Sequence, residues 1–293
     1  MMRPRRFVRV ALGLMIAFGL LLLFSPAPAG GVQGQALYVA IGGENALAFV
    51  DPAAKKVENF PIEGAKEPHA VALSPDQKTI YVGNSGDGKV VVVDAATKKT
   101  VKVVEGANVV CRMVWSLDRQ TLYLTDMKNG RIYQFNPSSQ KVTGSLPVAE
   151  SLCGLDFTQD GKRAFTGNML PGGQVVVLDW ETKQVVEKIP VGRMPHHVAL
   201  TSDGKSLYVA VGGEGVITKI DLATQTITAK IPTGGDPHAI LIAPDGQRGY
   251  VTVRGKPQAG ESSIFVLDLA TERIVDQIPG VGPRACDVIF AQR

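Results

Sequence analysis

Cysteine, histidine and aromatic residues are scarce in this chain: its 293 residues include three cysteines, four histidines and 6% aromatic residues. Three cysteines cannot all pair with one another. The sequence also lacks the Cys-x-x-Cys-His motif of covalent haem, the Gly-x-Ser-x-Gly nucleophile elbow, a P-loop, a dinucleotide-binding glycine fingerprint and an EF-hand loop. These absences disfavour hydrolase chemistry and leave no motif for a nucleotide or an EF-hand calcium ion.

An excess of charge is also missing from the body of the chain. The sequence carries 31 basic and 27 acidic residues, and four of the basic ones (Arg3, Arg5, Arg6 and Arg9) lie within residues 1–29, which contain no acid. The remainder therefore holds 27 residues of each sign. A body without net charge has no electrostatic reason to bind nucleic acid or anionic lipid, so we expect neither as a partner.

One long hydrophobic run is present, near the start of the sequence. Basic residues 1–9 precede an apolar run over residues 10–24, and the small-residue pattern Ala27-Pro28-Ala29 follows. This order is typical of a cleaved secretory signal, and the run is short for a membrane span, which needs roughly 20 residues. We expect residues 1–29 to be a signal peptide and residues 30–293 to be exported, to the periplasm or outside the cell. The membrane would be a partner only through an uncleaved signal.

A unit of four short strands is repeated along the rest of the chain. The high content of glycine and proline, 32 and 18 residues, already favours many short strands over long helices. The first strand of the unit carries an aromatic residue in most copies and recurs at spacings of 42 or 43 residues, starting at Leu37, Ile80, Leu122, Ala164, Leu207 and Gly249. Four short strands in roughly 42 residues is the period of a β-propeller blade.

The repeats predict an all-β fold, a six-bladed β-propeller of four-stranded blades with no helix longer than a turn. The six units cover about residues 37–79, 80–121, 122–163, 164–206, 207–248 and 249–293. The last unit stops after its fourth strand, residues 286–290, whereas the first unit begins at its aromatic strand. We therefore expect the C-terminal strand to pair with the N-terminal blade and close the ring.

The repeated pieces Leu-Tyr-Val-Ala, Val-Asp-x-Ala-Thr and Pro-His-x-Val-Ala-Leu resemble those of the YVTN-repeat β-propellers, which include the YncE-like exported proteins. The resemblance covers residues 37–293. It implies a propeller fold, but the family has surface, binding and enzymatic members, so no single function is implied. Many relatives have seven blades, and the six repeats found here depart from that pattern.

Recurring aspartates are assigned to turns rather than to a carboxylate site. One set ends the second strand of each unit, and its members are Asp51, Asp94, Asn136, Asp179, Asp221 and Asp268. Asp and Asn suit such positions because their side chains accept hydrogen bonds from nearby backbone N–H groups.

The start of the fourth strand carries a histidine or a cysteine in every unit: His69, Cys111, Cys153, His196, His238 and Cys286. The chain has seven such residues in all, and the seventh, His197, is adjacent to this set. Because the fourth strand is expected to be innermost, the six side chains should encircle one mouth of the central channel. Imidazole and thiolate are ligands of zinc and copper, so we predict that a subset of about four residues binds one copper or zinc ion, with the adjacent pairs Cys111/Cys153 and His196/His238 as the expected donors.

Other interpretations of the same residues stay open. The histidines also fit a repeat consensus without a ligand role, and Cys111 and Cys153 on adjacent blades also fit a disulfide in an oxidising compartment. The leading hypothesis is an exported, monomeric metal-binding propeller with a redox role as one option. The alternatives are a non-catalytic scaffold for another exported protein or a surface polymer, and an enzyme acting on a small organic substrate.

Overall fold

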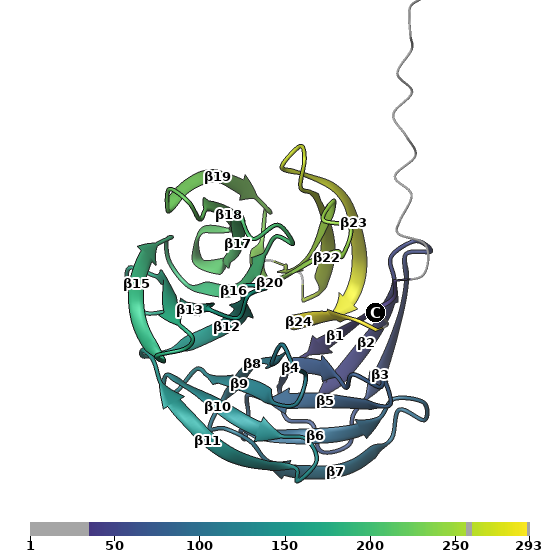
Figure 1. Ribbon diagram of the computed structural model, residues 1–293. Helices are drawn as coiled ribbons and strands as arrows, with labels where there is room; N and C mark the ends of the chain where they lie inside the picture. The colour runs from purple at the N-terminus through teal and green to yellow at the C-terminus, as the bar shows by residue number, and fades with distance from the viewer. Residues whose placement is uncertain (1–34, 256–259, 292–293) are drawn as a thin grey trace, which may run out of the picture. The chain divides into compact units, whose positions relative to one another are not determined.

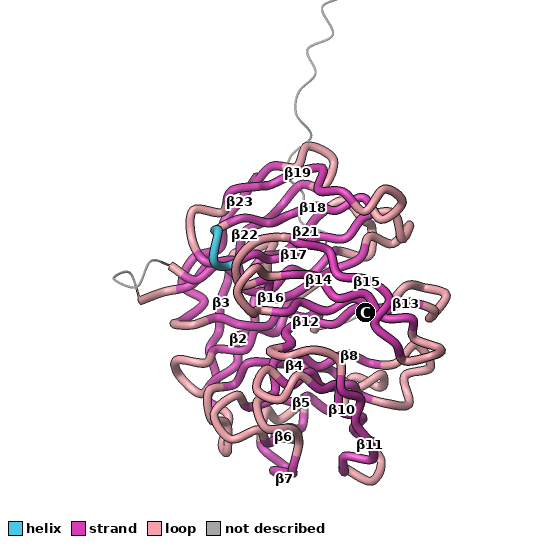
Figure 2. Tube along the Cα trace, turned by 90° about the vertical axis from the view of Figure 1, so that its left-hand side faces the viewer, coloured by secondary structure: helices cyan, strands magenta, loops and turns pink. Residues whose placement is uncertain are grey.

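The computed structural model describes residues 35–255 and 260–291. The expected signal peptide, residues 1–29, lies outside the described residues. Regular structure in the described part consists of strands and one 3₁₀ turn, η1 (Gly212–Glu214), which Figure 2 shows as the single helical segment. No helix among these residues is long and apolar enough to cross a membrane.

The described strands form six antiparallel sheets of four strands, which confirms the predicted all-β propeller. Blade 1 contains β1 (Leu37–Ile41), β2 (Ala46–Asp51), β3 (Lys56–Pro61) and β24 (Ala285–Phe290). Blade 2 contains β4 (Pro68–Leu73), β5 (Thr79–Asn84), β6 (Lys89–Asp94) and β7 (Thr100–Glu105). Blade 3 contains β8 (Val110–Trp115), β9 (Leu122–Asp126), β10 (Arg131–Asn136) and β11 (Lys141–Pro147).

The remaining blades follow the same order. Blade 4 contains β12 (Leu152–Phe157), β13 (Arg163–Asn168), β14 (Gln174–Asp179) and β15 (Gln184–Pro190). Blade 5 contains β16 (Pro195–Leu200), β17 (Ser206–Val211), β18 (Val216–Asp221) and β19 (Thr226–Pro232). Blade 6 contains β20 (Asp236–Ile242), β21 (Arg248–Arg254), β22 (Ser262–Asp268) and β23 (Arg273–Gly282).

One edge strand of each sheet lines the centre of the ring: β24 in blade 1 and the first strand of the sheet in blades 2 to 6. Each of these inner strands contacts the inner strands of the two neighbouring blades, in the cyclic order β4, β8, β12, β16, β20, β24 (Figure 1). The middle strands are buried on both faces and read as apolar runs, such as Val90–Val93 within β6, whereas the outer strand β11 alternates exposed and half-buried side chains. Aromatic residues pack between blades: the ring of Tyr81 lies 6.0 Å from that of Trp115.

The ring closes as the sequence predicts. Strand β24 pairs antiparallel with β1, with Leu37 opposite Phe290, and Figure 1 shows the yellow β24 beside the purple β1. The backbone N–H of Ala291 extends the pairing by donating to the carbonyl of Ala36 at 2.7 Å. Each sequence repeat therefore spans two sheets, because its last strand is the inner strand of the following blade.

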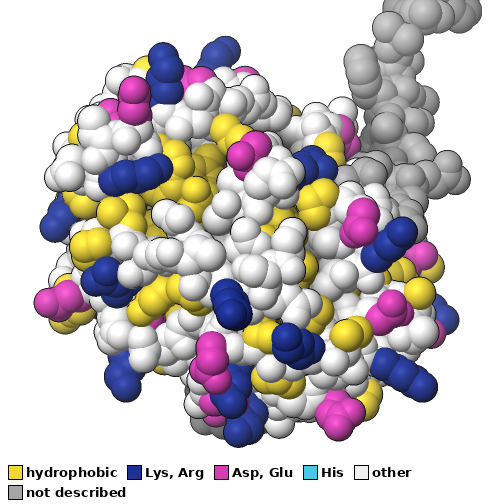
Figure 3. Space-filling model, turned by 60° about the horizontal axis from the view of Figure 1, so that its bottom comes forward, with side chains coloured by type: hydrophobic (Ala, Val, Ile, Leu, Met, Phe, Trp, Pro, Cys, Tyr) yellow, Lys and Arg dark blue, Asp and Glu magenta, His cyan; other side chains and the backbone are white. Residues whose placement is uncertain are grey.

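The surface charges and turns also agree with the sequence. In the turn after β6, the Asp94 carboxylate accepts hydrogen bonds from the backbone N–H and the hydroxyl of Thr97, at 2.8 and 2.7 Å. On the face shown in Figure 3, basic and acidic side chains are interspersed and no described histidine is visible. The four histidines and three cysteines are all buried.

Candidate metal centre in the channel

The histidines and cysteines lie near the starts of the inner strands, where a repeated Gly-x-x-Pro or equivalent loop enters each strand. All six predicted residues are buried, and so is His197. Three sets have ligand atoms within 4.8 Å of one another among the described residues: His69 with His238 and Cys286, His69 with Cys111 and His197, and Cys153 with His196 and His238. The structure thus brings side chains from all six blades into one cluster, which we call the channel cluster.

A disulfide joins Cys111 and Cys153 across blades 3 and 4, with Cα atoms 5.4 Å apart. In this oxidised state neither residue offers a thiolate, although both were predicted as ligands. Cys286 is the free cysteine of the chain, and it is buried. The thiol of Cys286 and the four imidazoles are therefore the ligands that the channel cluster provides while the disulfide is closed.

Hydrogen bonding determines the tautomer of His69. Its Nδ1 lies 2.9 Å from the carbonyl oxygen of Cys111, and because a carbonyl can only accept, Nδ1 carries the proton. The neutral ring then has a lone pair on Nε2, which lies 2.9 Å from Nε2 of His238. A backbone carbonyl on Nδ1 with Nε2 left as the ligand atom is the arrangement that orients many metal-bound histidines.

Several ring nitrogens of the channel cluster are buried without a hydrogen-bond partner among the described residues. They include both nitrogens of His196 and Nδ1 of His238, which are 5% and 1% exposed. The two rings are tilted by 45° against each other, with centroids 4.0 Å apart. Leaving a polar group both buried and unpaired costs roughly 1–3 kcal/mol, so a ligand that engages these nitrogens would remove that cost.

Burial keeps the imidazoles uncharged. It lowers the pKa of His69 to about 4 and that of His196 to about 3, with the nearby Arg254 cation acting in the same direction. The pKa of His238 is lowered well below its usual value, again by burial first. At neutral pH each ring is therefore in the form that binds metals.

Cys286 sits beside a cation. Burial raises the pKa of its thiol, but the guanidinium of Arg254 opposes the rise, because Nη2 of Arg254 lies 2.9 Å from Sγ. Arg254 is itself held by the carbonyl of Ala285 at 3.2 Å and by Asp236, whose carboxylate lies 3.9 Å away. This guanidinium is placed to stabilise a negative charge on Cys286.

Arg112 and Asp287 form a second polar layer that sequence reasoning missed. Asp287 is fully buried, forms an ion pair with Arg112 and accepts a hydrogen bond from the backbone N–H of Val71 at 3.0 Å. Nδ1 of His197 lies 3.6 Å from the same carboxylate. The repeat could have indicated this layer. The residues directly after the His/Cys set alternate between small and polar types: Ala70, Arg112, Gly154, His197, Ala239 and Asp287.

Comparison with known proteins supports the fold. Hydrazine synthase of Kuenenia stuttgartiensis is 20% identical, with 84% of each chain covered and a TM-score of 0.65. A protein of unknown function from Bacteroides caccae is 13% identical over 87% of this chain and 98% of that one, with a TM-score of 0.70. A functionally unknown protein from Desulfotomaculum acetoxidans is 14% identical over 83% and 79%, with a TM-score of 0.60.

At these identities the similarity shows the fold alone. No curated protein matches the sequence. A family model does match, over residues 62–239, which is more than half of the chain. The chain therefore belongs to the family described as domain of unknown function DUF5074.

Proposed function

We propose that the protein binds one copper or zinc ion inside the propeller channel, through His69, His238 and Cys286. The observation that carries the proposal is the convergence of three buried side chains whose ligand atoms all lie within 4.8 Å of one another. Two imidazoles and one thiolate suit Cu(I), which accepts soft and nitrogen ligands. Zinc, whose structural sites have four ligands, would need a fourth donor, and His196 is the candidate because its ring centroid lies 4.0 Å from that of His238.

The spacing of the ligand atoms supports this assignment. The two Nε2 atoms of His69 and His238 are 2.9 Å apart. Bonds of about 2.0–2.1 Å to one ion would place them roughly 90° apart, and a shift of about 0.4 Å would give a tetrahedral angle. The side chains are thus close to a binding arrangement before any ion arrives, and Arg254 offsets the charge of the Cys286 thiolate.

Metal titration of protein purified without a chelating tag tests the proposal. We expect one ion per chain, a higher melting temperature on loading, and an affinity loss of about 100-fold or more for His238→Ala and for Cys286→Ser, because each removes a ligand. Competition with a chromophoric chelator measures the affinity, and elemental analysis measures the stoichiometry.

The matched control is the double variant Cys111→Ser/Cys153→Ser, which removes two sulfurs that the disulfide withholds from the ion. It should keep one ion per chain. Because the Cys286 thiol must lose its proton to bind, affinity should fall about tenfold per pH unit as the pH drops, and more steeply below the His69 pKa of about 4, where that ligand also protonates. An unloaded wild type, or full affinity in Cys286→Ser, would disprove the site.

We also propose that the protein is exported and that residues 1–29 are removed. The Cys111–Cys153 disulfide supports this, since disulfides persist in oxidising compartments. The repeated Leu-Tyr-Val and Pro-His pieces support kinship with the exported YVTN-repeat propellers. N-terminal sequencing of protein recovered from the periplasm or medium should begin near Gly30, whereas recovery only with Met1 in place would contradict processing.

A further inference from the structure

A second potential site lies at the other end of the channel. The histidines are near the starts of the inner strands, whereas a cavity of about 420 Å³ is lined by residues at the ends of β4, β8, β12, β20 and β24. The layer formed by Arg112 and Asp287 lies between the two, since Arg112 lines the cavity and Asp287 approaches His197. The volume is within the range of small-molecule sites, about 300–1,000 Å³.

The aromatic side chains in the wall of the cavity are held in place by contacts with their neighbours. Trp115 donates its indole N–H to the carbonyl of Leu73 at 2.7 Å. The ring of Phe157 packs edge-on against Trp180 with centroids 4.8 Å apart, and Phe290 packs against Tyr250 at 6.0 Å. Aromatic walls with fixed positions need no reordering when an apolar group enters, which favours binding.

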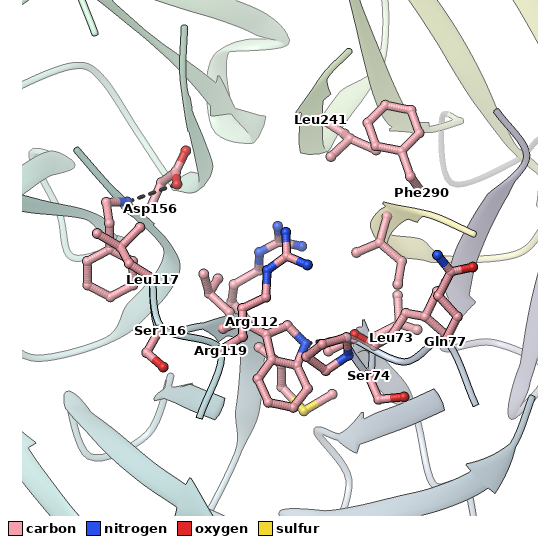
Figure 4. A pocket seen from close by; sticks show the side chains of 18 residues that line it. Leu73, Ser74, Gln77, Arg112, Ser116, Leu117, Arg119, Asp156, Leu241 and Phe290 are labelled. Atoms are coloured by element: carbon pink, nitrogen blue, oxygen red, sulfur yellow. Dashed lines mark hydrogen bonds between the residues drawn. The ribbon is translucent and has the colours of Figure 1, made fainter. Parts of the chain in front are cut away.

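Two cations point into this cavity. Figure 4 shows the guanidinium groups of Arg112 and Arg119 directed toward its middle, with Leu241 and Phe290 on the facing side. Arg112 is paired with Asp287. Arg119 is exposed and forms no ion pair with any carboxylate in the described part of the chain, so its fork of donors is available to a ligand.

Asp156 is the carboxylate among the cavity residues, and it accepts hydrogen bonds from backbone N–H groups. Its oxygens accept hydrogen bonds from the backbone N–H groups of Phe157 and Leu200, both at 2.8 Å. These bonds tie β12 to β16 and orient the carboxylate along the wall of the cavity. A second anion in the cavity would therefore be drawn to the side of Arg119.

We propose that this cavity binds a small aromatic carboxylate, with its carboxylate on Arg119 and its ring against Trp115, Phe157 and Phe290. A guanidinium matches a carboxylate with two parallel hydrogen bonds, and the aromatic side chains offer a surface for the ring. This site is independent of the metal ion proposed for the opposite end of the channel.

Calorimetric titration of the purified protein with benzoate, benzamide and acetate tests the proposal. Benzoate should bind saturably with a dissociation constant of about 1 mM or lower, and benzamide and acetate at least about tenfold more weakly, because one lacks the charge and the other the ring. Arg119→Gln should weaken benzoate binding about tenfold. Gln is tolerated there, since Gln77 occupies the equivalent turn position of blade 2 with a similar positive φ, 61° against 57°.

Arg273→Gln is the matched control, because it removes the same charge from an exposed residue that does not line the cavity. Its benzoate affinity should equal that of the wild type. The proposal is overturned if benzoate does not saturate, if benzamide binds equally well, or if the two variants lose the same affinity.

Discussion

Deletion of residues 285–293 is expected to abolish folding, not to leave a shortened chain that still folds. The deletion removes β24, the inner strand of blade 1, and with it the buried side chains of Val288 and Phe290. Loss of those two alone costs about 3–6 kcal/mol of burial, comparable to the roughly 5–15 kcal/mol that stabilises a typical domain. Strand β1 would also present a free edge, so the product should aggregate. Size-exclusion chromatography and thermal melting measure the outcome.

A circular permutant provides the control. Residues 285–291 are moved in front of Ala36 through an Asn-Gly turn, which suits two antiparallel strands, and the chain then ends at Arg284. Every strand pair is retained, so the permutant should melt cooperatively like the wild type. A deletion variant that stays monomeric with an unchanged melting temperature would show that β24 is not needed for closure.

Replacing Asp287 with alanine is expected to destabilise the protein by about 3–5 kcal/mol, because a buried cation loses its partner. The side chain of Arg112 is 14% exposed and pairs with Asp287, which also accepts the N–H groups of Val71 and Val288 at 3.0 and 2.8 Å. The variant leaves the Arg112 guanidinium and the two backbone N–H groups without their acceptor. Urea unfolding followed by circular dichroism measures the loss.

Two further variants separate the ion pair from the general effect of mutating a core residue. The double variant Asp287→Leu/Arg112→Met removes both charges and should recover much of the lost stability. Burial raises the pKa of Asp287 to about 6, so below that pH the folded wild type also carries a neutral side chain there. Because this pKa is raised above its value in the unfolded chain, the wild type gains stability as the pH falls from 8 to 5, whereas Asn does not titrate. The penalty of Asp287→Asn should accordingly be larger at pH 5 than at pH 8. A loss below about 1 kcal/mol for Asp287→Ala would contradict this account.

The fold could be predicted from the sequence because the information is local and repeated. Each 42- or 43-residue interval between aromatic strands predicts one blade from its own residues. The incomplete first and last units predict how the ring closes. Only the closure needed an inference between distant residues, and the pairing of Leu37 with Phe290 confirms it.

The candidate site was less accessible to such reasoning. The placement of the histidines and cysteines follows from their position in the repeat, but the disulfide depends on how closely β8 approaches β12. Arg254 reaches Cys286 from the end of another strand, β21, and no repeat pattern marks it. The cavity residue Arg119 lies in a turn, where the direction of a long side chain depends on its neighbours. Metal binding by the channel cluster stays a prediction.

The pairing of β24 with β1 also constrains the timing of folding during synthesis. The strands of blade 1 leave the ribosome first, yet their inner strand is made last among the described strands. Blades 2 to 6 each become complete in turn, whereas blade 1 must wait with an unpaired edge until residue 290 has emerged. A chain interrupted late in synthesis therefore keeps an open ring, and cellular quality control can distinguish it from a finished one by that single exposed edge.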